Sequence, residues 1–122
     1  MKIAICPGSY DPVTYGHLDI IKRSAVLVDK LIVTVFVNPS KKTSLFSIEE
    51  RLDMLRETTK DIPNIEVDTS TGLLNVYAAS KNCHLLIRGL RAFSDFEYEF
   101  QRALMIKKID PTLETAFFMT DG

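Results

Sequence analysis

The sequence lacks the features that mark disulfide-rich, membrane-spanning or nucleic-acid-binding proteins. It has only two cysteines, Cys6 and Cys83, and no Cys-x-x-Cys spacing, so the pattern favours reduced thiols in a core over a disulfide or zinc framework. No apolar run approaches the roughly 20 residues that cross a bilayer, and the apolar start is too short for a signal peptide. With 15 basic and 16 acidic residues, the chain has no general positive field to hold nucleic acid. We therefore expect a cytoplasmic protein that binds neither membranes nor nucleic acid.

Short apolar or β-branched runs alternate with helical patterns, which is typical of a parallel sheet with crossover helices. The length fits one domain, residues 1–122. We expect strands at residues 2–6, 30–37, 65–67, 83–87 and 115–119, and helices from about residue 16 and over residues 47–60, 73–81 and 94–108. Ser47 with Glu50 forms a capping box, and Ser94 is the expected cap of the last helix. The sequence thus predicts an α/β fold, a Rossmann-like, doubly wound five-stranded parallel sheet with helices on both faces.

Unusual residues gather in the loops that follow the predicted strands. In open parallel sheets, ligands bind outside the carboxyl ends of the strands, where the strand order reverses. The loops there contain Ser9, Asp11 and His17; Asn38, Ser40, Lys41 and Lys42; residues 72–74; and residues 88–91. The loops at the opposite end, such as residues 60–64, look like ordinary turns. The pattern places the candidate site at one edge of the sheet.

The first loop has the composition of an anion site. Gly8 would let a ligand approach the backbone closely, and Ser9 offers a hydroxyl. Gly16 and His17 stand where a helix begins, so free N–H groups and the helix dipole favour a phosphate there. A plain loop with an exposed histidine at the start of a helix would have the same residues, so this motif alone leaves both interpretations open.

Two arginines and a lysine could hold phosphate groups. Arg88 and Arg91 lie three residues apart across a glycine, and guanidinium groups bind phosphate oxygens through forked hydrogen bonds. An isolated Arg88 would be better explained as a surface salt bridge, but Gly89 and Arg91 share its loop. Lys41 could bind a ligand or could form a solvated basic pair with Lys42, and spacing alone favours neither interpretation.

Several motifs together carry a family resemblance. The residues Ser9-x-Asp11-Pro12-x-Thr14-x-Gly16-His17 resemble the (H/T)xGH signature of the nucleotidyltransferase superfamily. Within that superfamily, the stretches at residues 39–42, 46–51, 87–91 and 95–99 resemble bacterial phosphopantetheine adenylyltransferases, and the similarity runs from about residue 2 to about residue 119. The resemblance implies transfer of the adenylyl group of ATP to 4'-phosphopantetheine, giving dephospho-coenzyme A and pyrophosphate.

The resemblance also implies roles for individual positions. The catalytic set is His17, Lys41 and Arg88. The positions for phosphopantetheine are Ser9, Lys41, Leu74 and Arg88. The positions for ATP are Ser9, Tyr10, His17, Gly89, Leu90, Arg91 and Glu99. His17 would stabilise the pentacoordinate transition state at the α-phosphate, and Lys41 and Arg88 would hold the phosphate of phosphopantetheine.

The implied reaction is a direct in-line attack. A phosphate is already an ionised nucleophile, so no general base is needed, and the protein contributes alignment and charge stabilisation. Mg²⁺ would accompany ATP and pyrophosphate and keep most of its waters, and the sequence contains no metal site of its own. The resemblance also implies binding of dephospho-coenzyme A or coenzyme A, and members of this family are typically homohexamers.

Two alternatives stay open. Another small-molecule nucleotidyltransferase, such as a cytidylyltransferase or a nicotinamide mononucleotide adenylyltransferase, would use the first-loop signature equally well. A non-catalytic module could hold ATP or a coenzyme A product without turnover. Family members usually continue for several dozen residues that include an Ile-Ser-Ser-Ser-type motif for the nucleotide phosphates. This sequence ends at Gly122, so we expect a chain that is short at its C-terminus relative to the family.

Overall fold

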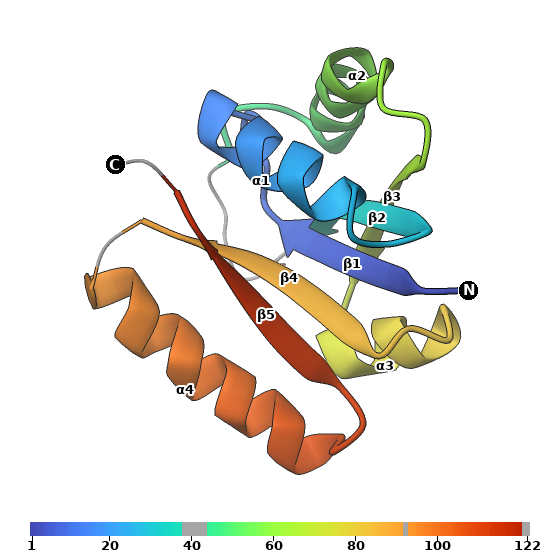
Figure 1. The fold of residues 1–122 in the computed structure, drawn as a ribbon. Coiled ribbons are helices and arrows are strands. Elements are labelled where there is room, and N and C mark those ends of the chain that lie inside the picture. The colour runs from blue at the N-terminus through green and yellow to red at the C-terminus, as the bar shows by residue number, and fades with distance from the viewer. Residues whose placement is uncertain (38–43, 92, 121–122) are drawn as a thin grey trace.

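The computed structural model describes residues 1–37, 44–91 and 93–120, with the side chains of residues 93–95 also left out of the description. Its strands are β1 (Ile3–Gly8), β2 (Lys30–Val37), β3 (Ile65–Thr71), β4 (Leu85–Leu90) and β5 (Glu114–Met119). Its helices are α1 (Tyr15–Ala25), α2 (Ile48–Thr59), α3 (Leu74–Ser80) and α4 (Phe93–Ile109). Strands and helices alternate along the chain, as the sequence predicts (Figure 1).

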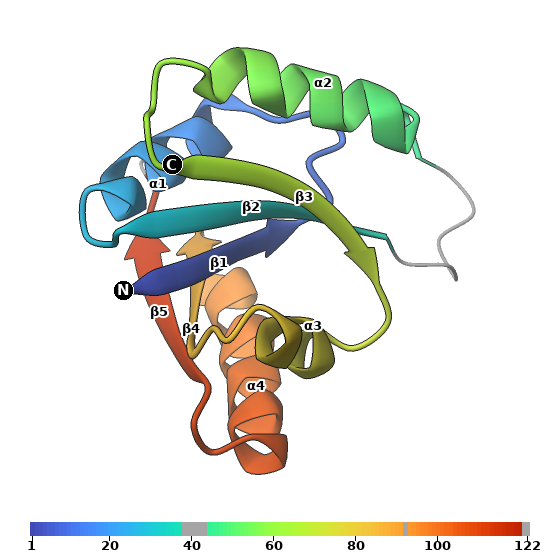
Figure 2. The ribbon, with the colours of Figure 1, turned by 90° about the vertical axis from the view of Figure 1, so that its right-hand side faces the viewer.

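The five strands form one parallel sheet in the order β3-β2-β1-β4-β5. From β1 the chain proceeds to β2 and β3 on one side, then crosses to β4 and β5 on the other. Helices α1 and α2 cover one face of the sheet, and α3 and α4 cover the other (Figures 1 and 2). The expected doubly wound α/β fold is therefore confirmed. Its strand order reverses between β1 and β4, which is the position where such sheets bind ligands.

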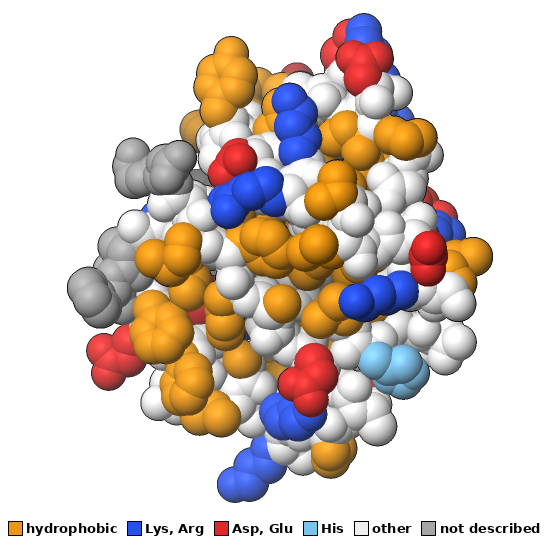
Figure 3. Space-filling model, viewed as in Figure 1, with side chains coloured by type: hydrophobic (Ala, Val, Ile, Leu, Met, Phe, Trp, Pro, Cys, Tyr) orange, Lys and Arg blue, Asp and Glu red, His pale blue; other side chains and the backbone are white. Residues whose placement is uncertain are grey.

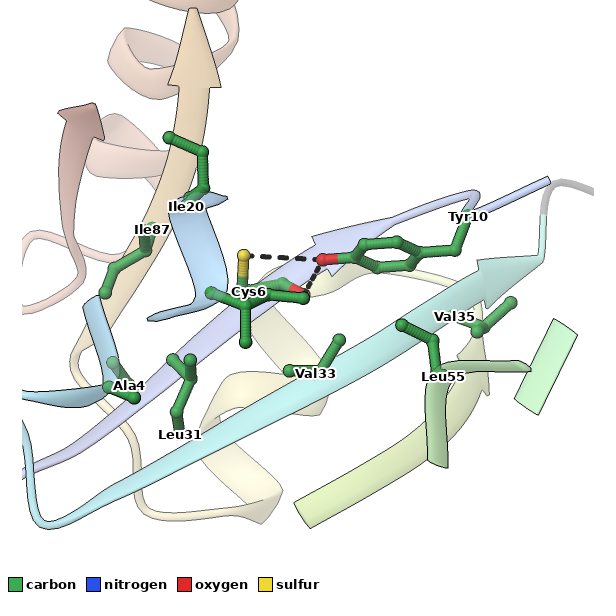
Figure 4. Close-up of a cluster of buried hydrophobic side chains, with 11 residues drawn as sticks. Ala4, Cys6, Tyr10, Ile20, Leu31, Val33, Val35, Leu55 and Ile87 are labelled. Carbon is green, nitrogen blue, oxygen red and sulfur yellow. Dashed lines mark hydrogen bonds between the residues drawn. The ribbon is translucent and has the colours of Figure 1, made fainter. Parts of the chain in front are cut away.

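The central strands are buried on both faces because alternate side chains enter two different cores. In β1, Ala4 and Cys6 belong to the cluster under α1 and α2, whereas Ile5 belongs to the cluster under α3 and α4. The first cluster is shown in Figure 4. Cys6 and Cys83 are both free and buried, which confirms the expected core thiols. Across the described ranges, no helix combines the length and apolarity needed to span a membrane.

Local sequence signals explain where α1 and α2 begin, since Thr14 and Ser47 cap them. The Ser47 side chain accepts a hydrogen bond from the Glu50 N–H, and the Glu50 side chain accepts one from the Ser47 N–H, which confirms the capping box of α2. The prediction for α4 is wrong at its first residue. This helix begins at Phe93, so Ser94 lies inside it rather than ahead of it as a cap.

Three strands extend further than their apolar residues indicate. The first begins at Ile3 and continues past Cys6 to Gly8, which pairs with Val35 of β2. The third strand continues from residue 67 to Thr71, where Thr71 pairs with Val37 of β2. The fourth starts at Leu85 rather than at Cys83 and continues to Leu90, which pairs with Met119 of β5. Backbone pairing with a neighbouring strand, not side-chain polarity, sets these ends. Arg88, which was expected in a loop, therefore projects from a strand.

Candidate active site

A cleft opens at the carboxyl ends of β1 and β4, where the strand order reverses. Its volume is about 560 Å³, within the range of pockets that hold a drug-sized ligand. The lining comes from β1 and the loop after it, the first turns of α1, the end of β4, and α4. Seven of the sequence-predicted positions lie in this lining: Ser9, Tyr10, His17, Arg88, Gly89, Arg91 and Glu99. The fold thus brings residues from both halves of the chain to one site.

His17 is held in a defined orientation by the cap of α1. The backbone N–H of Thr14 donates a hydrogen bond of 3.0 Å to Nδ1 of His17, and the Thr14 hydroxyl oxygen accepts one of 3.3 Å from the His17 N–H. Because a backbone N–H can only donate, Nδ1 must be the acceptor, and the proton of the neutral ring is then on Nε2. The Tyr10 ring packs edge-on against the imidazole at 4.9 Å between centroids. His17 therefore presents Nε2–H as a donor that no other described residue uses.

The electrostatic surroundings keep His17 neutral. Although its side chain opens onto the cleft, partial desolvation of the ring, together with the nearby positive charge of Arg91, holds the pKa of His17 below its ordinary value of 6.5. Protonation would also place a hydrogen on Nδ1 and break its bond from Thr14. The arrangement favours a neutral imidazole that donates one hydrogen bond to a ligand oxygen, rather than an imidazolium or a general base.

Tyr10 borders the cleft, but its side chain is turned into the core. The residue is 2% exposed, and its hydroxyl donates to the Cys6 carbonyl at 2.9 Å and to the Cys6 Sγ at 3.3 Å (Figure 4). A Cβ atom on Gly8 would lie 3.1 Å from Cε2 of this ring. Glycine at position 8 is therefore needed for the packing of Tyr10, and because Gly8 also lines the cleft, its expected role in the approach of a ligand stays a prediction.

Arg88 forms a forked ion pair with Glu99 across the cleft wall. Its Nε donates to Oε2 of Glu99 at 2.7 Å, and its Nη2 donates to Oε1 at 2.8 Å. Nη1 donates to the Pro7 carbonyl at the end of β1, at 3.1 Å. The side chains are 20% and 12% exposed, so this is a partly buried pair and not the solvated surface salt bridge considered as an alternative. Arg102 approaches the same carboxylate at 3.6 Å.

The first loop is tied to the start of α2 by two residues to which the sequence analysis gave no role of this kind. The Asp11 carboxylate accepts hydrogen bonds from the backbone N–H groups of Leu45 and Phe46, both at 2.8 Å. Arg51, which is only 7% exposed, donates from Nη1 to the Ser9 carbonyl at 3.1 Å. Asp11 lies in the first loop, and Arg51 ends the motif at residues 46–51. The sequence signal for these two residues is that each is a charged residue inside a motif. Their partners could not be predicted because they lie far away in sequence.

The other predicted positions fall in different places. Leu74 is the first residue of α3 and lines a second, smaller hollow next to the cleft, where it meets Arg88 and Glu99. Leu90 is buried, and its carbonyl already accepts from the Thr120 N–H at 2.9 Å, so it does not line the cleft. Gly89 lets α1 approach β4, since a Cβ there would lie 3.1 Å from Ile20. Lys41 lies outside the described residues.

Comparison with known proteins agrees with this geometry. The cytidylyltransferase-like family model matches residues 5–122. The chain is 62% identical to the phosphopantetheine adenylyltransferase of Caldanaerobacter subterraneus subsp. tengcongensis, over 98% of this chain and 74% of that protein. It is 58% identical to the enzyme of the same name from Desulfosudis oleivorans, over 98% of this chain and 71% of that protein.

A solved structure shows the same fold at much lower identity. The lipopolysaccharide core biosynthesis protein from Thermoplasma volcanium GSS1 superposes with a TM-score of 0.72 at 18% identity, over 100% of this chain and 99% of that one. Proteins of low sequence identity thus share the fold. The phosphopantetheine adenylyltransferases differ from them in their high identity to this chain. The chain belongs to the phosphopantetheine adenylyltransferases, within the cytidylyltransferase-like family.

Proposed function

We propose that this chain transfers the adenylyl group of ATP to 4'-phosphopantetheine, forming dephospho-coenzyme A and pyrophosphate. The observation that carries the proposal is the pairing of two phosphate-binding groups on one cleft, a neutral His17 donor on α1 and the guanidinium of Arg88 on β4. An adenylyl transfer to a phosphate needs both, because the reacting α-phosphate and the attacking phosphate must be held side by side. The relatives at 62% and 58% identity carry this activity in their names.

His17 would act on the α-phosphate. Charge builds up on the α-phosphate oxygens as the acceptor phosphate attacks, and Nε2–H of His17 would donate to one of them. The Thr14 bond to Nδ1 orients the ring before the substrate arrives. No proton has to be removed from the nucleophile, which is consistent with an imidazole whose pKa is lowered by desolvation and by Arg91.

The other positions divide between the two substrates. Arg88 would hold the acceptor phosphate, with Lys41 as a second cation and Leu74 against the pantetheine arm. The backbone of residues 9 and 10, and of Gly89 and Arg91, would bind the nucleotide, because the Tyr10 side chain is committed to the core and Leu90 does not line the cleft. Glu99, the remaining nucleotide position, is paired with Arg88 and Arg102 in the structure.

Magnesium would enter with the substrate as MgATP. No three His, Cys, Asp or Glu side chains gather as metal ligands in the part of the chain that the structure describes. Phosphate oxygens and water suit Mg²⁺, which gives up its waters reluctantly. The residues described here would therefore bind the phosphates that carry the metal rather than the metal itself.

We also propose that the chain assembles with copies of itself in the cytoplasm, as a homohexamer. Helix α4 carries large apolar side chains on its outer surface, and Figure 3 shows hydrophobic groups gathered over it. They are Phe96, Tyr98, Phe100, Leu104, Met105 and Ile109, each between 42% and 65% exposed. Exposed apolar patches of this kind mark sites of association. Light scattering coupled to size exclusion measures the number of subunits directly.

The proposal is tested by offering several acceptors and nucleotides and identifying the products by mass spectrometry. Dephospho-coenzyme A formed from ATP and 4'-phosphopantetheine, with little product from CTP or from nicotinamide mononucleotide, would support it. Product from nicotinamide mononucleotide or from CTP instead would make the chain another nucleotidyltransferase. Tight binding of coenzyme A without any product would make it a binding module.

A further inference from the structure

The carboxylate of Glu99 is directed at Arg88 with both of its oxygens. Oε2 accepts from Nε at 2.7 Å and Oε1 from Nη2 at 2.8 Å, which is the two-bond geometry that fixes a guanidinium in one plane. Glu99 comes from α4 and Arg88 from β4, so the pair joins a helix to the edge of the cleft. The Glu99 side chain is only 12% exposed. Glu99 therefore restrains Arg88, and its carboxylate is little exposed to other donors in the solvent.

The pair leaves Arg88 with donors to spare. A guanidinium has five N–H groups, and Arg88 uses one on Nε and one on Nη2 for Glu99, and one on Nη1 for the Pro7 carbonyl. One N–H on Nη1 and one on Nη2 have no bond to another residue in the described part of the chain. These two atoms are neighbours on the end of the group, so together they match two oxygens of one phosphate.

Charge alone gives no reason for a carboxylate at this place. Glu99 lines a cleft that is proposed to hold two phosphate-bearing substrates, and a lone negative charge there would repel both. Its ion pair cancels the charge of Arg88, while Arg102 at 3.6 Å returns one positive charge to the group. The Glu99 carboxylate weakens the positive field of the cleft but holds the Arg88 guanidinium in place. Its role is therefore better explained by orienting Arg88 than by attracting a substrate.

We propose that Glu99 is a positioning residue for the acceptor: it holds Arg88 so that the remaining N–H groups on Nη1 and Nη2 meet the phosphate of 4'-phosphopantetheine. This inference rests on the proposed function and adds a role that is separate from any contact of Glu99 with the nucleotide. Without Glu99, Arg88 keeps its charge but loses two of its three fixed bonds. Acceptor binding should then weaken through lost orientation.

A double-mutant cycle measured by titration calorimetry tests this. The dissociation constants of 4'-phosphopantetheine and of ATP are measured separately for the wild type, Glu99→Ala, Arg88→Ala and the double variant. We expect Glu99→Ala to weaken acceptor binding roughly tenfold, a usual size for residues in direct contact. In the Arg88→Ala background the same change should weaken acceptor binding no further. Arg88→Lys provides a second background with measurable affinity, because lysine keeps the charge but not the fork.

Controls separate this role from simple damage to the fold. Glu97→Ala removes the same charge from an exposed position on the same helix and should leave acceptor binding unchanged. Glu99→Gln keeps the shape and one acceptor, so its effect should be smaller than that of Glu99→Ala. Thermal unfolding shows whether each variant is folded.

Three results would overturn the inference. Unchanged acceptor binding in Glu99→Ala, with only ATP binding weakened, would make Glu99 a nucleotide residue and nothing else. An equal loss of acceptor affinity in the wild-type and Arg88→Ala backgrounds would show that Glu99 does not act through Arg88. Full acceptor affinity in Arg88→Ala would instead remove Arg88 from the acceptor site, and so would contradict the proposed function together with the inference that rests on it.

Discussion

The backbone N–H of Thr14 lies 3.0 Å from Nδ1 of His17 and donates to it, so the residue that starts α1 also fixes the tautomer of the histidine three residues later. The bond uses a backbone donor, which every substitution at position 14 other than proline retains. His17 itself lies in the first turn of α1, where the exposed N–H groups of the helix favour an anion. The cap, the ring orientation and the end of the helix proposed to bind phosphate are therefore one local structure.

The pH dependence of turnover should follow from this arrangement. Desolvation and the charge of Arg91 lower the pKa of His17, so the neutral ring persists to pH values below its ordinary 6.5. The rate should be constant above pH 6.5 as far as His17 is concerned, and should fall only below it, as the ring gains a proton and loses the Thr14 bond. The pH profile of kcat measures this. An activity that rises on acidification through pH 6 would mean that the imidazolium is the active form.

The Asp11 carboxylate should matter for stability as well as for the site. It accepts two backbone hydrogen bonds at 2.8 Å from Leu45 and Phe46, and bonds to a charged group contribute about 1.5–3 kcal/mol. Asp11→Ala should therefore lower the free energy of unfolding in urea by about 2 kcal/mol. Asp53→Ala is the matched control, since its carboxylate is exposed and pairs with Arg56 at 3.4 Å. Equal losses in the two variants would show that the Asp11 bonds add nothing.

Gly8 and Gly16 should respond in opposite ways to alanine. A methyl group at position 8 would meet the Tyr10 ring at 3.1 Å, and that ring is fixed by its bond to Cys6, so Gly8→Ala should cost about 1–3 kcal/mol. At position 16 the nearest atom is the Thr14 hydroxyl oxygen at 3.6 Å, and alanine favours a helix by up to about 1 kcal/mol. Chemical denaturation of both variants gives the comparison. A destabilising Gly16→Ala with a neutral Gly8→Ala would contradict this account of the loop.

The polar network beneath α3 should set part of the acid stability. Burial raises the pKa of Asp68, but hydrogen bonds from Tyr77 at 2.6 Å and from the Thr69 N–H, with Lys81 at 3.3 Å, together lower it below its usual 3.8. A carboxylate with a lowered folded-state pKa stabilises the protein above its unfolded pKa and loses that contribution as the pH falls through the folded value. Asp68→Asn should flatten the decline in melting temperature below pH 4. If the melting temperature of Asp68→Asn declined below pH 4 as it does in the wild type, the protonation of Asp68 would not be coupled to folding.

The sequence predicts the architecture of this protein better than the details of its site. The strand at Lys30–Val37 has the predicted bounds because a continuous apolar run buried on both faces leaves no other assignment. The ends of β3 and β4 were missed because Asp68–Thr71 and Arg88–Leu90 are held there by backbone pairing with β2 and β5, which lie far away in sequence. Propensity and polarity are local signals and carry no information on such partners.

The site residues divide in the same way. Ser9, His17 and Arg88 could be placed at the cleft from sequence, since parallel strands gather their following loops at one edge. The burial of the Tyr10 side chain, the Arg88–Glu99 pair and the Arg51–Ser9 bond could not, because each depends on contacts between different parts of the chain. Tyr10 in particular has a positive φ of 47°, which turns its ring inward against the usual preference of such residues.

The most direct test of the account is pyrophosphate release from MgATP by the wild-type chain and by His17→Ala, each with and without 4'-phosphopantetheine. We predict release by the wild type that depends on the acceptor. His17→Ala should lower kcat at least about a hundredfold, the usual loss for a transition-state donor, while the dissociation constant for ATP changes little. Equal rates for the two proteins, or release that needs no acceptor, would contradict the assignment of His17 as the donor in an adenylyl transfer.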